Sequence, residues 1–304
     1  MTKMTTSELR GYQQICGPGG AVMVIACDQR GGIRQLLSPD KAAQAAVTDA
    51  MLGDIKADIV RHLAAHAPCV LLDPVCAVPR VVEEAALARD VALLIGLDAS
   101  GYDIGEGGHW RSRLAPGITA RRVRELGGTG GKLMVYLRSD HPDANAHNAS
   151  IIRQCVADFA AEDMLLVVEF LTYPLPGESP EEYKAKFPAL IEGGSRLCLE
   201  LGAKILKIPY PGTPEACANI TKMAGNVPWA VLSAGVDHAT FLGQVETCMA
   251  AGASGVIAGR SLWKDCVSLG AAQRKEWLTT RALPRLREIQ ALLARYPRPL
   301  SQRG

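Results

Sequence analysis

Eight short apolar runs rich in valine, isoleucine and leucine alternate along the chain with segments whose apolar spacing is helical. The predicted strands cover residues 21–28, 69–73, 91–98, 131–137, 164–171, 203–210, 228–235 and 253–259. The predicted helices between them cover residues 40–66, 80–89, 119–126, 146–161, 180–201, 214–224 and 238–251. Several of these helices open with a capping residue or an early proline, as at Ser179-Pro180 and Thr213-Pro214.

This alternation restricts the fold to the α/β class. Continuous apolar strands are typical of a parallel sheet that helices cover. Eight strand–helix units over about 240 residues predict a closed (β/α)8 barrel, or TIM barrel. A G-x-G-x-x-G motif does not follow the first strand, which disfavours a dinucleotide-binding sheet. We expect a single domain over residues 1–304, with a short polar N-terminal helix, a barrel core at about 20–268 and a C-terminal helix at about 271–296.

Composition excludes several classes of function. The 304 residues are 48% hydrophobic, and 33 basic against 31 acidic side chains give a net charge of +2, so no general attraction to nucleic acid or membrane is expected. No apolar run reaches the roughly 20 residues that span a bilayer. Nine cysteines without a C-x-x-C pair predict buried, reduced thiols in a cytoplasmic protein.

Polar side chains gather where the predicted strands end. In a barrel of this kind the active site lies at the carboxyl ends of the strands. The polar residues predicted at these ends are Asp28, Asp73, Asp98, Arg138, Glu169, Lys207, Ser233 and Arg260.

Lys207 is the least expected of these residues, because it lies between Leu206 and Ile208 in an apolar strand. Alternation along the strand puts Lys207 on the barrel-facing side with Ile205, whereas Lys204 falls at the start of the strand and is expected to extend to solvent at the lower rim. Burial favours the neutral amine, which can attack a carbonyl group. A structural lysine paired with a carboxylate is the alternative.

Three more charged side chains are predicted to meet Lys207 inside the barrel. Lys132 falls on the same face of the fourth predicted strand as Met134 and Tyr136. Glu169 lies near the top of the fifth predicted strand. A second lysine favours the neutral form of one member of the pair, and a carboxylate can hold or pass on a proton. With Asp28 at the end of the first strand, these residues predict catalysis through an imine, or Schiff base.

The last two strands predict a phosphate site. Glycine lets backbone N–H groups approach an anion closely, and an arginine adds a charge-assisted contact. In this fold the loops after strands seven and eight commonly bind phosphate. The candidates are Ser233, Gly235, Gly259 and Arg260.

Other polar segments are expected to stay outside the chemistry. His62 and His66 have a spacing that metal ligands can have, but no third ligand is near, so we predict no metal site. The glycine-rich segment 105–117 is expected to be a flexible loop, in which Arg111 and Arg113 could meet the far end of a charged substrate. The C-terminal segment predicts a helix that packs outside the barrel or against a second subunit, as in a homo-oligomer.

Seven short motifs, in order, resemble the class I tagatose-1,6-bisphosphate aldolase family, including its sulfofructosephosphate aldolase branch. They are ACDQR, LLD followed by proline, GKLMVYLRSD, VVEF, ILKIPYP, WAVLSAGV and GVIAGRSLW, across residues 26–263. The resemblance implies a (β/α)8 lyase that cleaves a phosphorylated ketose through a lysine imine, without metal or another cofactor. It implies that Lys207 forms the imine, that Lys132 and Glu169 serve as acid–base residues, that Asp28 and Gln29 belong to the first-strand motif, and that Ser233, Gly235, Gly259 and Arg260 bind the ketose phosphate.

The motifs leave the ketose open. Proline stands at 209, where the family often has glutamate two residues after the imine lysine. Residues 137–140 (LRSD) resemble the sulfosugar branch, and residues 100–103 (SGYD) resemble the tagatose branch. The rival functions are a phosphosugar isomerase or epimerase, a metal-dependent aldolase, and a sugar-phosphate sensor without catalysis.

Overall fold

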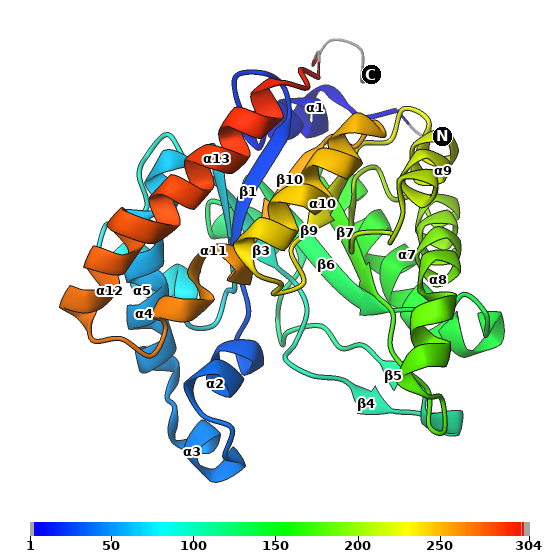
Figure 1. Ribbon diagram of the computed structural model, residues 1–304, viewed down its shortest axis with the longest axis horizontal. Helices are drawn as coiled ribbons and strands as arrows, with labels where there is room; N and C mark the ends of the chain where they lie inside the picture. The colour runs from blue at the N-terminus through cyan, green and yellow to red at the C-terminus, as the bar shows by residue number, and fades with distance from the viewer. Residues whose placement is uncertain (1–2, 299, 301–304) are drawn as a thin grey trace.

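A closed parallel barrel forms the centre of the protein, as the alternation of strands and helices predicts. A computed structural model describes residues 3–298 and 300, and within them eight parallel strands close in the order β1-β10-β9-β8-β7-β6-β3-β2. The barrel strands are β1 (Val22–Cys27), β2 (Cys69–Leu72), β3 (Ala92–Gly96), β6 (Gly130–Tyr136), β7 (Leu165–Leu171), β8 (Leu206–Ile208), β9 (Trp229–Leu232) and β10 (Gly255–Ala258). Helices cover the outside of the barrel in Figure 1, so the predicted (β/α)8 fold is confirmed.

Strand β8 is shorter than the predicted segment 203–210. Upstream, the Ala203 amide bonds the Cys198 carbonyl of the preceding helix and not a neighbouring strand. Downstream, Pro209 and Pro211 lack the N–H that a central strand donates. The strand is therefore limited to the three residues centred on Lys207.

Side chains of the strands divide into two apolar layers. Alternate residues such as Val22, Val24 and Ala26 fill the barrel interior. Their neighbours Met23 and Ile25 face the surrounding helices. The same alternation before and along β8 places Lys207 on the interior face with Ile205, as predicted.

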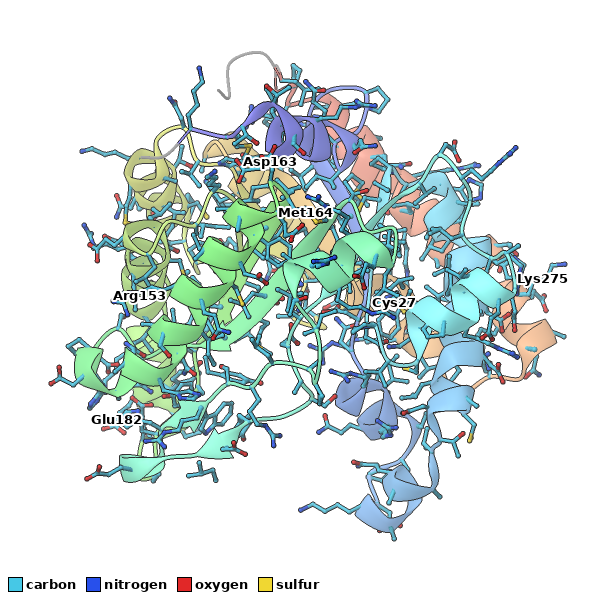
Figure 2. The ribbon with its side chains drawn as sticks, turned by 180° about the vertical axis from the view of Figure 1, so that it is seen from behind. Cys27, Arg153, Asp163, Met164, Glu182 and Lys275 are labelled. Atoms are coloured by element: carbon cyan, nitrogen blue, oxygen red, sulfur yellow. The ribbon has the colours of Figure 1, made fainter. Side chains whose placement is uncertain are left out.

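Helix α1 (Thr6–Gln14) lies across the end of the barrel at which the strands begin (Figure 1). Thr5 and Glu8 form a capping box, and Figure 2 shows Asp163, which accepts a hydrogen bond from Thr5, beside this helix. Lys204 does not extend freely to solvent as predicted, because its Nζ lies 2.5 Å from Glu8 Oε2. An ion pair between α1 and the segment just before β8 thus replaces the expected exposed lysine.

The helices follow the predicted segments with local differences. The segment 40–66 divides into α3 (Lys41–Ala46), α4 (Asp49–His62) and the short turn η1 (Ala64–His66), because Val47 is extended and Thr48 caps α4. Helix α2 (Gly31–Leu37), after β1, is not in the prediction. The remaining barrel helices are α5 (Ala77–Glu83), α6 (Ala120–Glu125), α7 (Ala146–Ala161), α8 (Pro180–Glu200), α9 (Pro214–Ala224), α10 (His238–Ala250) and α11 (Arg260–Trp263).

The predicted C-terminal helix is present but interrupted. Helix α12 (Ala271–Trp277) passes through a π-helical turn, η5 (Leu278–Ala282), into α13 (Leu283–Ala294). Pro284 has no N–H to continue the ladder of hydrogen bonds, which accounts for an irregular turn just before it. Helix α12 contacts α4 and α13 contacts α10, so this segment packs on the chain's own barrel.

A small antiparallel hairpin replaces the flexible loop predicted after the third barrel strand. Its strands are β4 (Asp103–Ile104) and β5 (Trp110–Arg111), and they lie at the opposite end of the barrel from α1 (Figure 1). The Trp110 ring lies between Tyr102 and Tyr173, with centroid distances of 3.7 Å and 4.6 Å. Stacking of three aromatic rings gives this segment the apolar contacts that its many glycines lack.

All nine cysteines are buried and none forms a disulfide, as the sequence predicts. Within residues 3–298 and 300, no helix is both long and apolar enough to cross a membrane.

An ion pair buried between α4 and the end of β2 engages Asp73, one of the polar residues predicted at the strand ends. Lys56 Nζ contacts Asp73 Oδ2, and the side chains are 0% and 2% exposed. Burial opposes the charge on Asp73, but Lys56 and the Cys76 N–H outweigh it and lower the Asp73 pKa. The pair therefore stabilises the fold above the pKa of an unfolded aspartate, and this contribution is lost as pH falls through the lowered value.

We expect Lys56→Met to lower the free energy of unfolding by about 3–5 kcal/mol at neutral pH, because it leaves Asp73 buried and unpaired. The double variant Lys56→Met/Asp73→Leu should regain most of this loss. Urea denaturation of both variants measures the difference. Equal stability of Lys56→Met and the native chain would show that the ion pair does not stabilise the fold.

Candidate active site

Lys207 and Glu169 form the centre of a buried charged cluster at the carboxyl ends of the barrel strands. The two residues are register partners on β8 and β7, so both side chains face the interior. Lys207 Nζ lies 2.8 Å from Glu169 Oε2, and the side chains are only 4% and 8% exposed. The structure thus brings together the predicted amine and its proton-handling carboxylate.

Lys132, on β6, binds three carboxylates. Its Nζ lies 2.6 Å from Asp28 Oδ2, 2.7 Å from Asp98 Oδ1 and 3.2 Å from Glu169 Oε2. Glu169 Oε2 therefore bridges the two lysines. Asp28, Lys132, Glu169 and Lys207 were all predicted to share this site, and the structure places them in one connected cluster.

Asp98 belongs to the cluster although it was not among the predicted site residues. The sequence did place it at the end of the third predicted strand, but several other strand ends carry a similar polar residue. Gly96, two residues before it on β3, lies beside Asp28, because a Cβ at this position would stand at an ordinary contact distance of 3.5 Å from Asp28 Cβ. Asp98 also begins the stalk of the β4–β5 hairpin by pairing with Leu114.

The pKa of Lys132 is raised, so Lys132 is not a lysine whose neutral form the cluster favours. Burial opposes the charge on Lys132, but Asp28, Asp98 and Glu169 outweigh it and hold the Lys132 pKa well above its usual value. Lys132 is therefore a permanent cation at neutral pH. It supplies a fixed positive charge, whereas Lys207 contacts one carboxylate of the cluster.

The two aspartates around Lys132 respond in opposite directions. Burial opposes ionisation of Asp28, but Lys132 and Lys207 outweigh it and lower the Asp28 pKa. Burial dominates at Asp98 and, with the nearby charges of Asp28 and Glu169, raises its pKa despite the contact with Lys132. Neighbouring carboxylates with separated pKa values are typical of catalytic sites.

The residues predicted to bind phosphate gather at the ends of β9, β10 and β1. Gly259 N donates to Ser233 Oγ at 3.4 Å, and a Cβ at Gly235 would stand 3.4 Å from Arg260 Cζ. Gln29 Nε2 lies 3.5 Å from the position of a Cβ on Gly259. Within the described part of the chain no hydrogen bond or ion pair engages the Arg260 guanidinium, and Gln29 Oε1 is buried without a partner.

Backbone strain also marks the turn after β9. Ala234 has φ 49° and Gly235 has φ 85°, so two successive residues adopt the left-handed region that non-glycine residues avoid. Such strain persists where the surrounding structure requires it, often at ligand sites. The predicted phosphate residues are thus close together, while their role in binding remains a prediction.

Comparison with known proteins decides the family. A sequence model of the DeoC/LacD family aldolases matches residues 22–265, which is most of the chain. The chain belongs to the DeoC/LacD aldolase family. This is a family of class I aldolases, and the predicted resemblance to tagatose-1,6-bisphosphate aldolases is confirmed.

Full-length relatives and solved structures agree with this membership. The tagatose 1,6-diphosphate aldolase of Staphylococcus haemolyticus is 24% identical, with 96% of this chain and 97% of that protein covered. The corresponding protein 1 of Streptococcus mutans is also 24% identical, over 95% and 96%. An archaeal fructose 1,6-bisphosphate aldolase has the same fold, with a TM-score of 0.63, 22% identity and coverage of 94% and 98%.

Arg138, at the end of β6, does not face the cluster of lysines and carboxylates. Its side chain is 0% exposed, and its guanidinium binds Asp140 and Glu178, each at 2.7 Å. The guanidinium also donates to the Tyr173 carbonyl at 2.7 Å. The LRSD segment, which resembles that of one branch of the DeoC/LacD family, therefore forms an internal ion cluster that leaves Arg138 no vacant donor face for a substrate anion.

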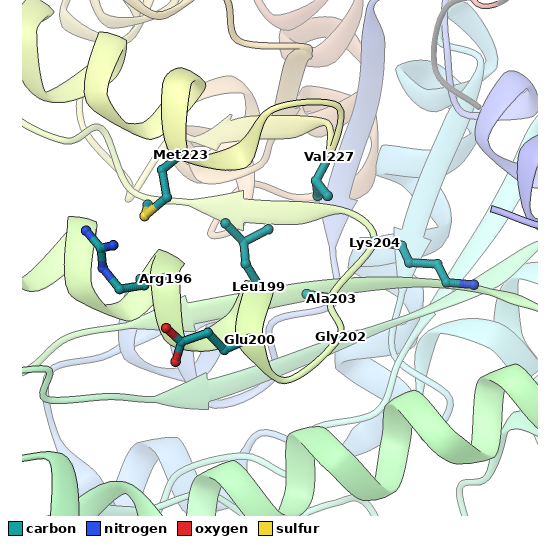
Figure 3. A pocket seen from close by; sticks show the side chains of 8 residues that line it. All are labelled: Arg196, Leu199, Glu200, Gly202, Ala203, Lys204, Met223 and Val227. Carbon is teal, nitrogen blue, oxygen red and sulfur yellow. The ribbon is translucent and has the colours of Figure 1, made fainter. Parts of the chain in front are cut away.

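Cavities elsewhere in the described residues are distinct from this site. The one in Figure 3 is lined by the end of α8, the start of the β8 segment and the end of α9, including Arg196, Lys204 and Met223, at the barrel end where α1 lies. Another is lined by His109, Arg111, His141 and His147 beside the hairpin. Among residues 3–298 and 300, no group of three or more histidine, cysteine or carboxylate side chains is arranged to hold a metal ion.

Proposed function

We propose that this chain cleaves a phosphorylated ketose to dihydroxyacetone phosphate and an aldehyde through an imine on Lys207. The contact between the buried Lys207 amine and Glu169 is the observation that supports this proposal most strongly. A lysine surrounded by low-dielectric interior needs a partner to accept its proton before it can act as a nucleophile. Glu169 lies at hydrogen-bond distance for that transfer.

The reaction follows from the positions of these groups. The neutral Lys207 amine adds to the ketone carbon to give a carbinolamine. Its hydroxyl then takes back the proton that Lys207 gave to Glu169 and leaves as water, which gives a protonated imine. A base takes the proton of the hydroxyl on carbon four, the bond between carbons three and four breaks, and its electron pair moves into the imine to give an enamine. The aldehyde departs, carbon three is protonated, and water hydrolyses the imine to release dihydroxyacetone phosphate and the amine.

Glu169 is our candidate for the proton transfers at the imine and at the substrate hydroxyl. It contacts both lysines through one oxygen, so its negative charge stays close to the developing positive imine. Lys132 holds Asp28, Asp98 and Glu169 in place as a permanent cation. Asp28 Oδ1 is buried without a partner in the described residues and is available to accept a hydrogen bond from a substrate hydroxyl.

A panel of candidate substrates tests this function. Tagatose 1,6-bisphosphate, fructose 1,6-bisphosphate and sulfofructose 1-phosphate would each be incubated with the protein, with released dihydroxyacetone phosphate measured by a coupled dehydrogenase. We expect cleavage of at least one compound, with no loss of rate in EDTA. Failure to release dihydroxyacetone phosphate from any of them would contradict the proposal, and inhibition by EDTA would favour a metal-dependent aldolase.

Arg260 should bind the phosphate on carbon one. We expect Arg260→Ala to raise KM for the ketose phosphate by about 10- to 100-fold, because one charge-assisted hydrogen-bonding group is lost, with a smaller change in kcat. Steady-state kinetics measure both constants. Arg285→Ala, which removes a cation paired with Asp265 outside this group, serves as the control. An unchanged KM in Arg260→Ala would exclude this role.

A further inference from the structure

The turn that follows β9 depends on support from outside its own residues. The Val236 amide donates to the Ser233 carbonyl at 3.1 Å, which closes a four-residue turn, here called the β9 turn (residues 233–236). Positive φ at both central residues, Ala234 and Gly235, is the pattern of a type I′ turn. Such turns prefer glycine, asparagine or aspartate at these positions, so an exposed alanine with φ 49° needs contacts that keep it there.

Lys264 supplies one of these contacts. Its Nζ donates to the Gly235 carbonyl at 2.7 Å, although the two residues are 29 positions apart in the sequence. Lys264 begins the short turn η4 (Lys264–Cys266), directly after Trp263. Trp263 is fully buried, and its Nε1 donates to the Ala26 carbonyl of β1 at 3.0 Å. The lysine therefore extends from a part of the backbone that β1 holds in place.

The charge of the Lys264 ammonium is not neutralised by a neighbour. The side chain is half-buried, and the adjacent carboxylate of Asp265 pairs instead with Arg285, at 3.3 Å. Within residues 3–298 and 300, no carboxylate lies at ion-pair distance from Lys264, whereas Lys132 and Lys207 both contact carboxylates. Solvent screens a half-buried charge less than an exposed one, so Lys264 attracts an anion beside the β9 turn.

Gly235 consequently lies between two cations. A Cβ on Gly235 would stand 3.4 Å from Arg260 Cζ, and the Gly235 carbonyl oxygen accepts from Lys264. The Gly235 N–H has no hydrogen-bond acceptor in the part of the chain that the structure describes. A backbone N–H binds a phosphate oxygen and a carbonyl oxygen repels it, so the orientation of these peptide groups decides whether the β9 turn binds an anion.

We propose that Lys264 is a positioning residue for the substrate phosphate. It keeps the Gly235 carbonyl from turning toward the anion, leaves the Gly235 N–H available, and adds a positive charge to that of Arg260. This inference rests on the proposed function and extends it to the residue that shapes the phosphate site. Gly259 N also donates to Ser233 Oγ, at 3.4 Å, so the segment 259–264 contacts two separate positions of the β9 turn.

Binding of dihydroxyacetone phosphate, measured by titration calorimetry, tests this role without knowledge of the ketose. We expect Lys264→Met, which has neither the donor nor the charge, to raise Kd by about 10-fold. Lys264→Gln keeps a donor without the charge and should give a Kd between those of Lys264→Met and the native protein. Lys264→Arg keeps both and should stay within about threefold of the native Kd. The control is Lys275→Met, which removes an exposed lysine of α12 at the outer surface (Figure 2) and should leave Kd unchanged.

The rate of borohydride trapping at saturating dihydroxyacetone phosphate distinguishes phosphate positioning from a general loss of structure. We expect the native rate in Lys264→Met, because this variant retains Lys207. An unchanged Kd in folded Lys264→Met, an equal rise of Kd in all three variants at position 264, or a lower trapping rate with an unchanged Kd would overturn the role of Lys264. If Lys264→Met does not fold, a native Kd in Lys264→Gln would overturn it.

Trapping of the native protein in the same experiment separates this inference from the proposed function. Trapping on Lys207 together with one of these contrary results would overturn the role of Lys264 alone. A native protein that binds dihydroxyacetone phosphate but is not trapped would overturn the imine, and the Kd values would still decide the role of Lys264. A native protein that does not bind the compound would overturn both.

Discussion

Replacement of Lys207 by methionine should lower the cleavage rate by about 10⁴-fold or more, because the variant has no amine to form the imine. Methionine has a similar length and no charge, so it fits an interior position without leaving a cavity. Glu169 keeps its contact with Lys132 in this variant and is not left unpaired. We therefore expect a folded protein, with a circular dichroism spectrum like that of the native chain, that binds ketose phosphate without cleaving it.

Lys204→Met provides the matched control for Lys207→Met. It removes a lysine from the same segment, but one that pairs with Glu8 at the other end of the barrel. We expect this variant to keep its activity and to lose stability, because Glu8 is then buried without its partner. Substantial turnover by Lys207→Met, or inactivity of the folded Lys204→Met, would contradict the assignment of the nucleophile.

Replacement of Lys132 by methionine should lower both the stability of the fold and the activity. It removes the cation that contacts Asp28, Asp98 and Glu169, and breaking a buried charge cluster in this way costs about 3–5 kcal/mol. The remaining carboxylates should then favour their protonated forms in the folded state. Denaturation experiments measure the loss, and Lys132→Met/Asp98→Asn should recover part of it by removing one of the unpaired charges.

The sign of the pH dependence of stability shows whether Lys132→Met loses stability through the missing charge or through loss of packing. In the native chain the Asp28 pKa is lowered, so its contribution to stability is present above the unfolded value of about 4 and is lost as pH falls through the folded value. In Lys132→Met the carboxylates should have raised folded pKa values, so stability should fall as pH rises through them. An equal loss of stability at pH 5 and pH 8 would show that packing, and not charge, is responsible.

Local patterns in the sequence were sufficient to predict the barrel and the positions of its central residues. Apolar runs separated by helical segments predict parallel strands. Because side chains alternate between the two faces of a strand, Lys207, Glu169 and Lys132 are predicted to face the barrel interior. Both signals depend on residues a few positions apart. The two catalytic candidates Lys207 and Glu169 then become register partners because neighbouring strands of a barrel align their inward positions.

What the sequence could not show depends on partners that are distant along the chain. Asp73 and Asp98 both follow apolar strands, yet Lys56 on α4 draws Asp73 outward and Lys132 draws Asp98 inward. Lys204 resembles a solvent-exposed lysine until Glu8, 196 residues away, is placed beside it. The hairpin at Trp110 likewise depends on Tyr173, which belongs to the segment after another strand. The spacing of residues along the sequence does not indicate which of these distant partners a side chain contacts.

Borohydride reduction in the presence of dihydroxyacetone phosphate, followed by peptide mapping with mass spectrometry, tests the central claim most directly. Reduction converts an imine to a stable secondary amine and thereby marks the lysine that formed it. We predict one adduct, on Lys207, and none on Lys132 or Lys204. A protein that binds dihydroxyacetone phosphate but gives no adduct, or gives it on a different lysine, would contradict an imine mechanism at Lys207.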